Sequence, residues 1–499
     1  MKKTILIVTI FIHTVCYGQV NYQYYSKTEL EQDLAFFSEK LTSIHPLFLD
    51  KAVCSIWEDK LSLMRKSLKD SMTQNEFYLL IAPSLAFLND GHSYFRMPFD
   101  QRILYNKSGG LSFPFFVNII DSKIFVTQYN GDDNTLFSGG EEIIRINGIS
   151  CADMVLEMQK LFGGSSIANR QEAVADNFRT YIWMFYGFEK DYEMVIKNMQ
   201  NQTYQVSVPG ITSEQFQRNI KRFTHPKNEL YSFTIDNVHK TSILKVKSFG
   251  QLQSFCAFAD SAFSFIKKNK IENLIVDIRG NGGGRSVVVD SLMNYLTDKP
   301  YAQYRKMEIR VSPELKERYK EKYPDRYEWI NNYAINDLVV PDRTITLPSN
   351  NKLRFAGNLY LLTDKTSSSA AATFAGIFKE LKIGVIVGEQ TGGTIRYYGD
   401  YWDISTPNTT ITFGIAPKRF IQYGGTDLDR GVIPDHLVIN HGDSIINFVY
   451  NLIVNNEMPT SYIRNGELCG VFERSNMHQK RCSLIHKSSE FSQNSYLYN

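Results

Sequence analysis

The chain has 499 residues, too many for one ordinary hydrophobic core, so we expect more than one domain. Hydrophobic residues make up 43% and charged residues 21%, a balance that is typical of folded globular proteins and argues against a disordered chain. The formal charge of +3 is spread along the sequence without a block of Lys and Arg, so nothing in the composition points to nucleic acid as a partner.

The amino terminus has the order of an export signal. Lys2 and Lys3 precede an apolar run over residues 5–12, and the small residue Gly18 precedes Gln19. These features in this order predict a cleaved signal peptide over residues 1–18. The apolar run is short for a bilayer span, and no other segment resembles a transmembrane helix. We therefore expect an exported protein, periplasmic or extracellular, without a transmembrane span.

A helical domain is expected over residues 19–104. Apolar residues recur there at three- and four-residue steps, which is the spacing of one helix face. His45-Pro46 should end the first helix, because a proline disfavours helix in the residue before it. The last part of this domain contains the loop Asp90-Gly91-His92-Ser93.

A β-rich module is expected over residues 105–215. Strands at 113–120 and 123–128 flank a short turn, and an amphipathic helix begins near Cys151. The stretch 139–148, which ends in Asn-Gly, resembles the carboxylate-binding region of PDZ domains. That resemblance implies a module that holds an extended peptide by β-augmentation. An unrelated small β domain with an Asn-Gly turn remains an alternative.

Strands alternate with helices over residues 228–458. This alternation predicts an α/β core with a mainly parallel sheet and flanking helices. The expected strands lie at 242–246, 273–278, 358–363 and 383–387. A charged, tyrosine-rich stretch at about 299–350 interrupts the pattern and is interpreted as an insertion, a lid or a strap. The polar segment 459–499 is expected to be a poorly ordered tail.

Two turns of the core carry residues suited to chemistry. Residues 277–284 end a predicted strand with consecutive glycines, whose backbone N–H groups can approach an anion closely. A phosphate loop is the rival interpretation, but the Gly-Lys-Ser/Thr ending is missing. Ser369 follows the next strand and precedes Ala370 at the start of a helix. It is either a helix cap or an exposed serine beside a helix terminus that favours an oxyanion.

Taken together, six motifs in chain order resemble the tail-specific (carboxyl-terminal-processing) serine peptidases and the related tricorn core protease. The motifs are the 90–93 loop, the PDZ-like stretch, the 277–284 turn, the Ser-Ala-Ala helix start, Val-Gly-Glu at 387–389 with the glycines that follow, and Gly-Val-Ile-Pro-Asp at 431–435. The resemblance implies that Ser369 is the nucleophile. It also implies an oxyanion hole made by the backbone N–H of Gly283 (or Gly284) and that of Ala370.

Two positions depart from the family pattern. Ala372 replaces the usual glutamate, and Thr394 stands 25 residues after the serine, where the Ser-Lys branch has its lysine base. A threonine hydroxyl is no proton acceptor near neutral pH, so the Ser-Lys mechanism fails. The tricorn-like branch uses a histidine from a loop similar to 90–93, which implies His92 as the base. Ser93, or an acidic residue near the carboxyl-terminal motif such as Asp427, is expected to orient it.

The sequence thus predicts an exported serine endopeptidase that acts on polypeptide chains. No metal or organic cofactor is expected, because the histidines are scattered and none is paired at metal-ligand spacing. Two alternatives stay open. One is a catalytically silent peptide-binding protein, given the missing lysine and glutamate. The other is a ligand carrier, because interphotoreceptor retinoid-binding protein uses related modules to hold lipids.

Overall fold

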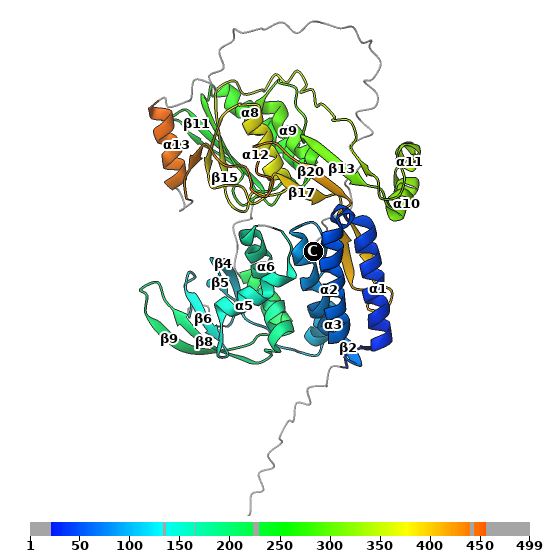
Figure 1. Ribbon diagram of the computed structural model, residues 1–499. Helices are drawn as coiled ribbons and strands as arrows, with labels where there is room; N and C mark the ends of the chain where they lie inside the picture. Colours follow the sequence, from blue (N-terminus) through cyan, green and yellow to red (C-terminus); the bar gives the residue numbers. More distant parts are fainter. Residues whose placement is uncertain (1–20, 133–135, 165, 223–228, 440–443, 456–499) are drawn as a thin grey trace, which may run out of the picture.

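The structure is a computed structural model that describes residues 21–132, 136–164, 166–222, 229–439 and 444–455. The predicted signal peptide and the predicted polar tail lie outside these residues. Figure 1 shows an α/β core above and two smaller parts side by side below it, a helical cap and a β-rich module. Among the described residues, no helix combines the length and apolar character that crossing a bilayer requires.

The helical cap begins with a well-defined helix start. The Ser26 hydroxyl accepts the N–H of Glu29, and the Glu29 carboxylate accepts the N–H of Ser26, which is a capping box at the start of α1. Helix α1 ends just before His45-Pro46, as its sequence predicts. The cap consists of β1 (Tyr24–Ser26), α1 (Lys27–Ile44), η1 (Pro46–Leu49), α2 (Lys51–Ser67), β2 (Ser71–Thr73), α3 (Gln74–Ile81), η2 (Ala82–Leu88), β3 (Tyr94–Phe95) and α4 (Asp100–Lys107). The expected domain boundary after residue 104 falls inside α4.

The β-rich module is a sheet with strand order β4-β5-β6-β8-β9, in which every pair is antiparallel. Asn147 and Gly148 both have positive φ, which lets them form the tight turn from β6 to β7. A helix begins at Cys151, where one was expected. The elements are β4 (Phe115–Ile120), β5 (Lys123–Tyr129), β6 (Glu142–Ile146), β7 (Ile149–Ser150), α5 (Cys151–Met158), η3 (Gln159–Leu161), α6 (Ile167–Tyr186), β8 (Asp191–Lys197), β9 (Thr203–Pro209) and α7 (Ser213–Arg222).

The core is a six-stranded sheet with helices on both faces. Its order is β10 (Tyr231–Asp236), β11 (Thr241–Val246), β12 (Asn273–Asp277), β15 (Asn358–Thr363), β16 (Val385–Gly388) and β21 (His436–Leu437). Only β10 runs antiparallel to its neighbour. Alternate strand residues point to opposite faces, so Leu274 packs with α8 (Leu252–Lys268), α9 (Ser286–Leu296) and α12 (Ala370–Glu380). Ile275 packs on the other face with α13 (Ser444–Val454). Figure 1 shows α13 apart from α8, α9 and α12.

A second sheet joins the predicted insertion to the segment that follows Ser369. Its order is β14 (Leu338–Val339), β13 (Lys306–Arg310), β20 (Lys418–Ile421) and β17 (Arg396–Gly399). The insertion also carries α10 (Pro313–Lys322) and α11 (Pro324–Asn331). Between β17 and β20, the hairpin of β18 (Trp402–Ser405) and β19 (Thr412–Ile415) reaches the cap, where β19 pairs with β3. This pairing fixes the loop before β3 against the core.

Candidate active site

Ser369 lies at the junction between β15 and α12. The turn before it is fixed by Asp364, whose carboxylate accepts the N–H groups of Ser367 and Gly280 at 3.0 and 3.1 Å. Ser369 has φ 49° and ψ −124°, a conformation that costs a non-glycine residue about 1–3 kcal/mol. Its hydroxyl makes no capping hydrogen bond to α12. The serine is therefore held in a strained backbone conformation that leaves its hydroxyl available, and it does not serve as a helix cap.

His92 meets Ser369 across 277 residues of sequence, with its Nε2 3.3 Å from the Ser369 Oγ. The imidazole lies beside the rings of Tyr397 and Tyr401, at centroid distances of 5.8 and 6.3 Å. Burial lowers the pKa of His92 from its ordinary value, although the charge of Asp90 opposes this shift. The neutral imidazole, which can accept a proton, is thus the favoured form near pH 7.

Asp90 is the acid nearest to the His92 ring. Its side chain is only 1% exposed, and its Oδ1 accepts the backbone N–H of His92 at 2.8 Å while lying 3.8 Å from the His92 Nδ1. Burial raises the pKa of Asp90, but hydrogen bonds from His45 and Ser93 and the charges of His45 and His92 outweigh it and lower the pKa overall. A buried carboxylate therefore faces the side of the imidazole opposite Ser369. The sequence contained a signal for it, an aspartate two residues before the histidine.

The two residues predicted to orient His92 lie in different environments, one buried and one exposed. Ser93 is buried beside the catalytic loop, where its hydroxyl accepts the N–H of Ala416 at 3.1 Å and bonds to Asp90. Asp427 is more than half exposed and pairs with Arg430 at 3.3 Å. None of the contacts described for Asp427 reaches His92, so the structure brings Asp90, and not Asp427, to the base.

The glycine turn of the core packs directly against Ser369. A Cβ on Gly283 would lie 2.6 Å from the Ser369 Cβ and 3.0 Å from the Ala370 nitrogen, so only glycine fits there. The Gly283 N–H donates to the Oδ1 of buried Asn281 at 2.8 Å, which leaves it engaged. Within the described ranges, the N–H groups of Gly284 and Ala370 donate no hydrogen bond. Of the expected oxyanion donors, the backbone N–H of Ala370 is thus available. Of the two glycines, Gly284 has an available N–H and Gly283 does not.

The departures from the family pattern have structural consequences. The Thr394 hydroxyl donates to the carbonyl of Arg396 at 2.6 Å and makes no described contact with Ser369. Ala372 is fully buried, and its methyl group lies against the backbone of Gly393. A longer side chain at position 372 would meet this backbone.

The module packs against the loop that contains His92. Gly163 packs so closely on the carbonyl of Asp90 that a Cβ there would lie 2.2 Å from its oxygen. The Ser166 hydroxyl donates to the carbonyl of Lys365 at 3.1 Å, near the start of the nucleophile turn. The module thus touches both the loop that contains His92 and the turn before Ser369.

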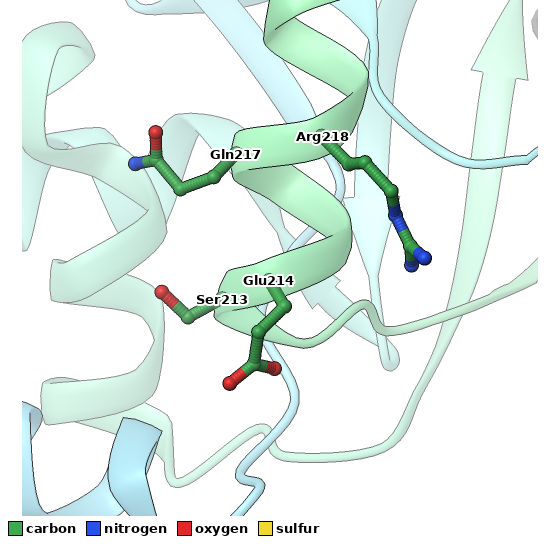
Figure 2. Close-up of a pocket in the computed structure, with 4 residues that line it drawn as sticks. All are labelled: Ser213, Glu214, Gln217 and Arg218. Carbon is green, nitrogen blue, oxygen red and sulfur yellow. The ribbon is translucent and has the colours of Figure 1, made fainter.

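The hollow on the surface of α7 lies away from Ser369 and His92 in the fold. The hollow drawn in Figure 2 is lined by Ser213, Glu214, Gln217 and Arg218, all on α7, and none of them contacts Ser369 or His92. In the part of the chain that the structure describes, no three His, Cys, Asp or Glu side chains cluster in a way that would hold a metal ion.

The chain is similar in sequence and in fold to known proteins. Residues 240–438 match the sequence profile of peptidase family S41. The tail-specific protease of Haemophilus influenzae is 24% identical over 241 residues, covering 45% of this chain and 30% of that protein, so the match spans less than a third of the relative. Mature CPAF superposes with a TM-score of 0.61 at 13% identity, covering 86% of this chain and 98% of that one. Mature CPAF complexed with lactacystin gives 0.60 at 14% identity, covering 86% and 99%. At these identities the solved structures establish a shared α/β fold.

Proposed function

We propose that this chain, whose residues 240–438 match the profile of peptidase family S41, is a serine-type endopeptidase that cleaves polypeptide substrates. The observation that carries the proposal is the 3.3 Å approach of the His92 Nε2 to the Ser369 Oγ, made by residues from the cap and the core. This distance is slightly above the about 2.6–3.2 Å of a formed catalytic hydrogen bond, as is common in apo sites.

The reaction proceeds by acyl transfer. The Ser369 Oγ attacks the peptide carbonyl carbon while the His92 Nε2 takes the hydroxyl proton. The resulting oxyanion accepts the N–H of Ala370, at the positive end of α12, and the N–H of Gly284 in place of the engaged Gly283. His92 then gives its proton to the leaving amine as the peptide C–N bond breaks. Water, activated by the same imidazole, hydrolyses the acyl-enzyme and returns the proton to Ser369.

Asp90 completes the arrangement as the orienting acid. Its carboxylate lies 3.8 Å from the His92 Nδ1 and is fixed by the hydrogen bond from the His92 backbone N–H. It stabilises the imidazolium that forms when His92 takes the proton from Ser369. Asp90 therefore takes the role for which Ser93 and Asp427 were the expected candidates.

The module and the amino terminus extend this proposal. A PDZ-like module would hold the substrate as an added strand next to the catalytic loop, and deleting residues 111–208 from a chain that still folds should weaken peptide binding. Export to the periplasm or the exterior rests on residues 1–18. Amino-terminal sequencing of the native protein should return Gln19, and an intact Met1 would contradict export.

A fluorophosphonate probe tests the enzyme assignment directly. The wild-type chain should be labelled at Ser369 and should cleave an unfolded protein such as casein, and S369A should lose both properties. A chain that binds peptides but resists acylation and cleaves nothing would instead be a silent peptide-binding protein. The buried Ala372 and the hydroxyl of Thr394, which bonds to Arg396, are the features that favour this second reading.

A further inference from the structure

A second histidine, outside the predicted site, lies behind the catalytic loop. His45 stands between α1 and η1 in the cap, and its side chain is completely buried. The N–H of Leu47 donates to its Nδ1 at 3.2 Å, so Nδ1 is the accepting nitrogen. In a neutral imidazole the other nitrogen then carries the hydrogen. That nitrogen, Nε2, lies 3.3 Å from the Oδ2 of Asp90 and is placed to donate to it.

We propose that His45 is a positioning residue of the catalytic base, which acts by holding the Asp90 carboxylate in the orientation that faces His92. The proposal rests on the proposed function. It adds a fourth residue to the series of side-chain contacts that runs from Ser369 through His92 to Asp90. His45 thereby has a role besides ending α1 before Pro46.

The division of donors over the two carboxylate oxygens supports this role. His45 binds Oδ2, whereas the His92 backbone N–H binds Oδ1, the oxygen that faces the His92 ring. Because the His45 N–H occupies Oδ2, a rotation of the carboxylate would break a hydrogen bond in a site that water does not reach. Without His45, the buried carboxylate would lose a donor and would be free to turn or to take up a proton.

His45 is itself fixed by the second sheet. The Arg310 Nη1, on β13, donates to the backbone carbonyl of His45 at 2.7 Å, and the ring of Tyr398, on β17, packs on the imidazole at 4.6 Å between centroids. Both contacts come from the part of the chain that follows the cap. The position of Asp90 therefore depends on the docking of the second sheet onto the cap.

Two amide variants separate this role from a packing role. In H45N the Asn amide reaches the place of Nδ1 and keeps an acceptor for Leu47, but nothing replaces the Nε2 donor. In H45Q the longer amide places an N–H group where Nε2 lies. We expect H45N to lower kcat/KM on a peptide by about 10- to 100-fold, the scale of a misplaced catalytic group. H45Q should keep most of the wild-type value.

A cycle with D90N tests whether His45 acts through Asp90. Once Asp90 is replaced, adding H45N should cost little more, whereas a packing defect would cost the same in both backgrounds. The control is H239A, which removes another His–Asp contact, the 2.8 Å pair of the His239 Nδ1 and Asp236, and should leave kcat/KM unchanged.

Each other outcome would overturn the proposal. H45N as active as wild type, H45N and H45Q equally impaired, or both failing to fold would show that His45 acts through packing alone or not at all. A wild-type chain that is not acylated at Ser369 would overturn the proposed function and this proposal with it. Normal wild-type activity with an unaffected H45N would overturn only this one.

Discussion

Replacing Gly283 by alanine should disable the protein through a single methyl group. The new Cβ would lie 2.6 Å from the Cβ of Ser369, 2.9 Å from the carbonyl oxygen of Ser368 and 3.0 Å from the nitrogen of Ala370. Two of these are backbone atoms that cannot move aside as the end of a flexible side chain would. Gly283 also has φ +113°, which alanine rarely adopts.

The expected cost follows from these two effects. A non-glycine residue in such a backbone region costs about 1–3 kcal/mol, and overpacking a close contact costs about 1–3 kcal/mol more. G283A should thus lose about 2–6 kcal/mol of unfolding free energy, against about 5–15 kcal/mol for a typical domain. If the loop moves to accommodate the methyl group, Ser369 moves too, and a shift of about 1 Å costs about 10²-fold in rate.

The same loop supplies the control. Gly282 has no atom within 4 Å of its added Cβ and no positive φ, so G282A should change stability by less than about 0.5 kcal/mol. Urea unfolding gives the stability of each variant, and fluorophosphonate labelling gives the reactivity of Ser369. G283A matching G282A in both measurements would refute the reasoning about this contact.

The remaining predictions concern the residues of the candidate active site. H92A should lower kcat about 10²–10⁴-fold without weakening peptide binding, whereas T394A should change kcat little. Steady-state kinetics measures both variants, and equal losses of kcat would contradict the histidine mechanism. Since burial lowers the pKa of His92, kcat/KM should rise with pH and level off with a midpoint below the ordinary 6.5. The charge of Asp90 raises that pKa, so D90N should move the midpoint still lower while reducing the plateau, and an upward shift would oppose this. S369G should be inactive yet more stable than S369A by about 1–2 kcal/mol, because glycine accepts the positive φ of this position, and equal thermal midpoints would argue against strain.

The parts of the site predicted from sequence are those carried by local motifs. The serine at the start of a helix and the histidine in an Asp-Gly-His loop each have a short pattern, and the structure brings Ser369 and His92 together. Strands such as β12 and β15 could also be predicted from the sequence, because a short apolar run between turns indicates a buried strand.

The parts that could not be predicted depend on long-range contacts. His45 reads as a helix end, and only the folded chain places it beside Asp90, 45 residues away. The segment around 299–350 reads as an insertion, yet its strand β13 pairs with β20, more than a hundred residues later, and its Arg310 binds the backbone of His45. Asp427 was preferred for its nearness to a motif, but side-chain geometry places it at the surface with Arg430.

The separation of base and nucleophile along the chain also sets when the protein can become active. His92 is synthesised 277 residues before Ser369, which at about 5–20 residues per second is a delay of roughly 14–55 s. The hairpin that pairs with β3 and the strand β21 come later still. A chain whose synthesis stops early carries the base without the nucleophile. Under the proposed mechanism, cleavage thus requires that synthesis has passed β21, so a shorter chain cannot cleave its unfolded neighbours.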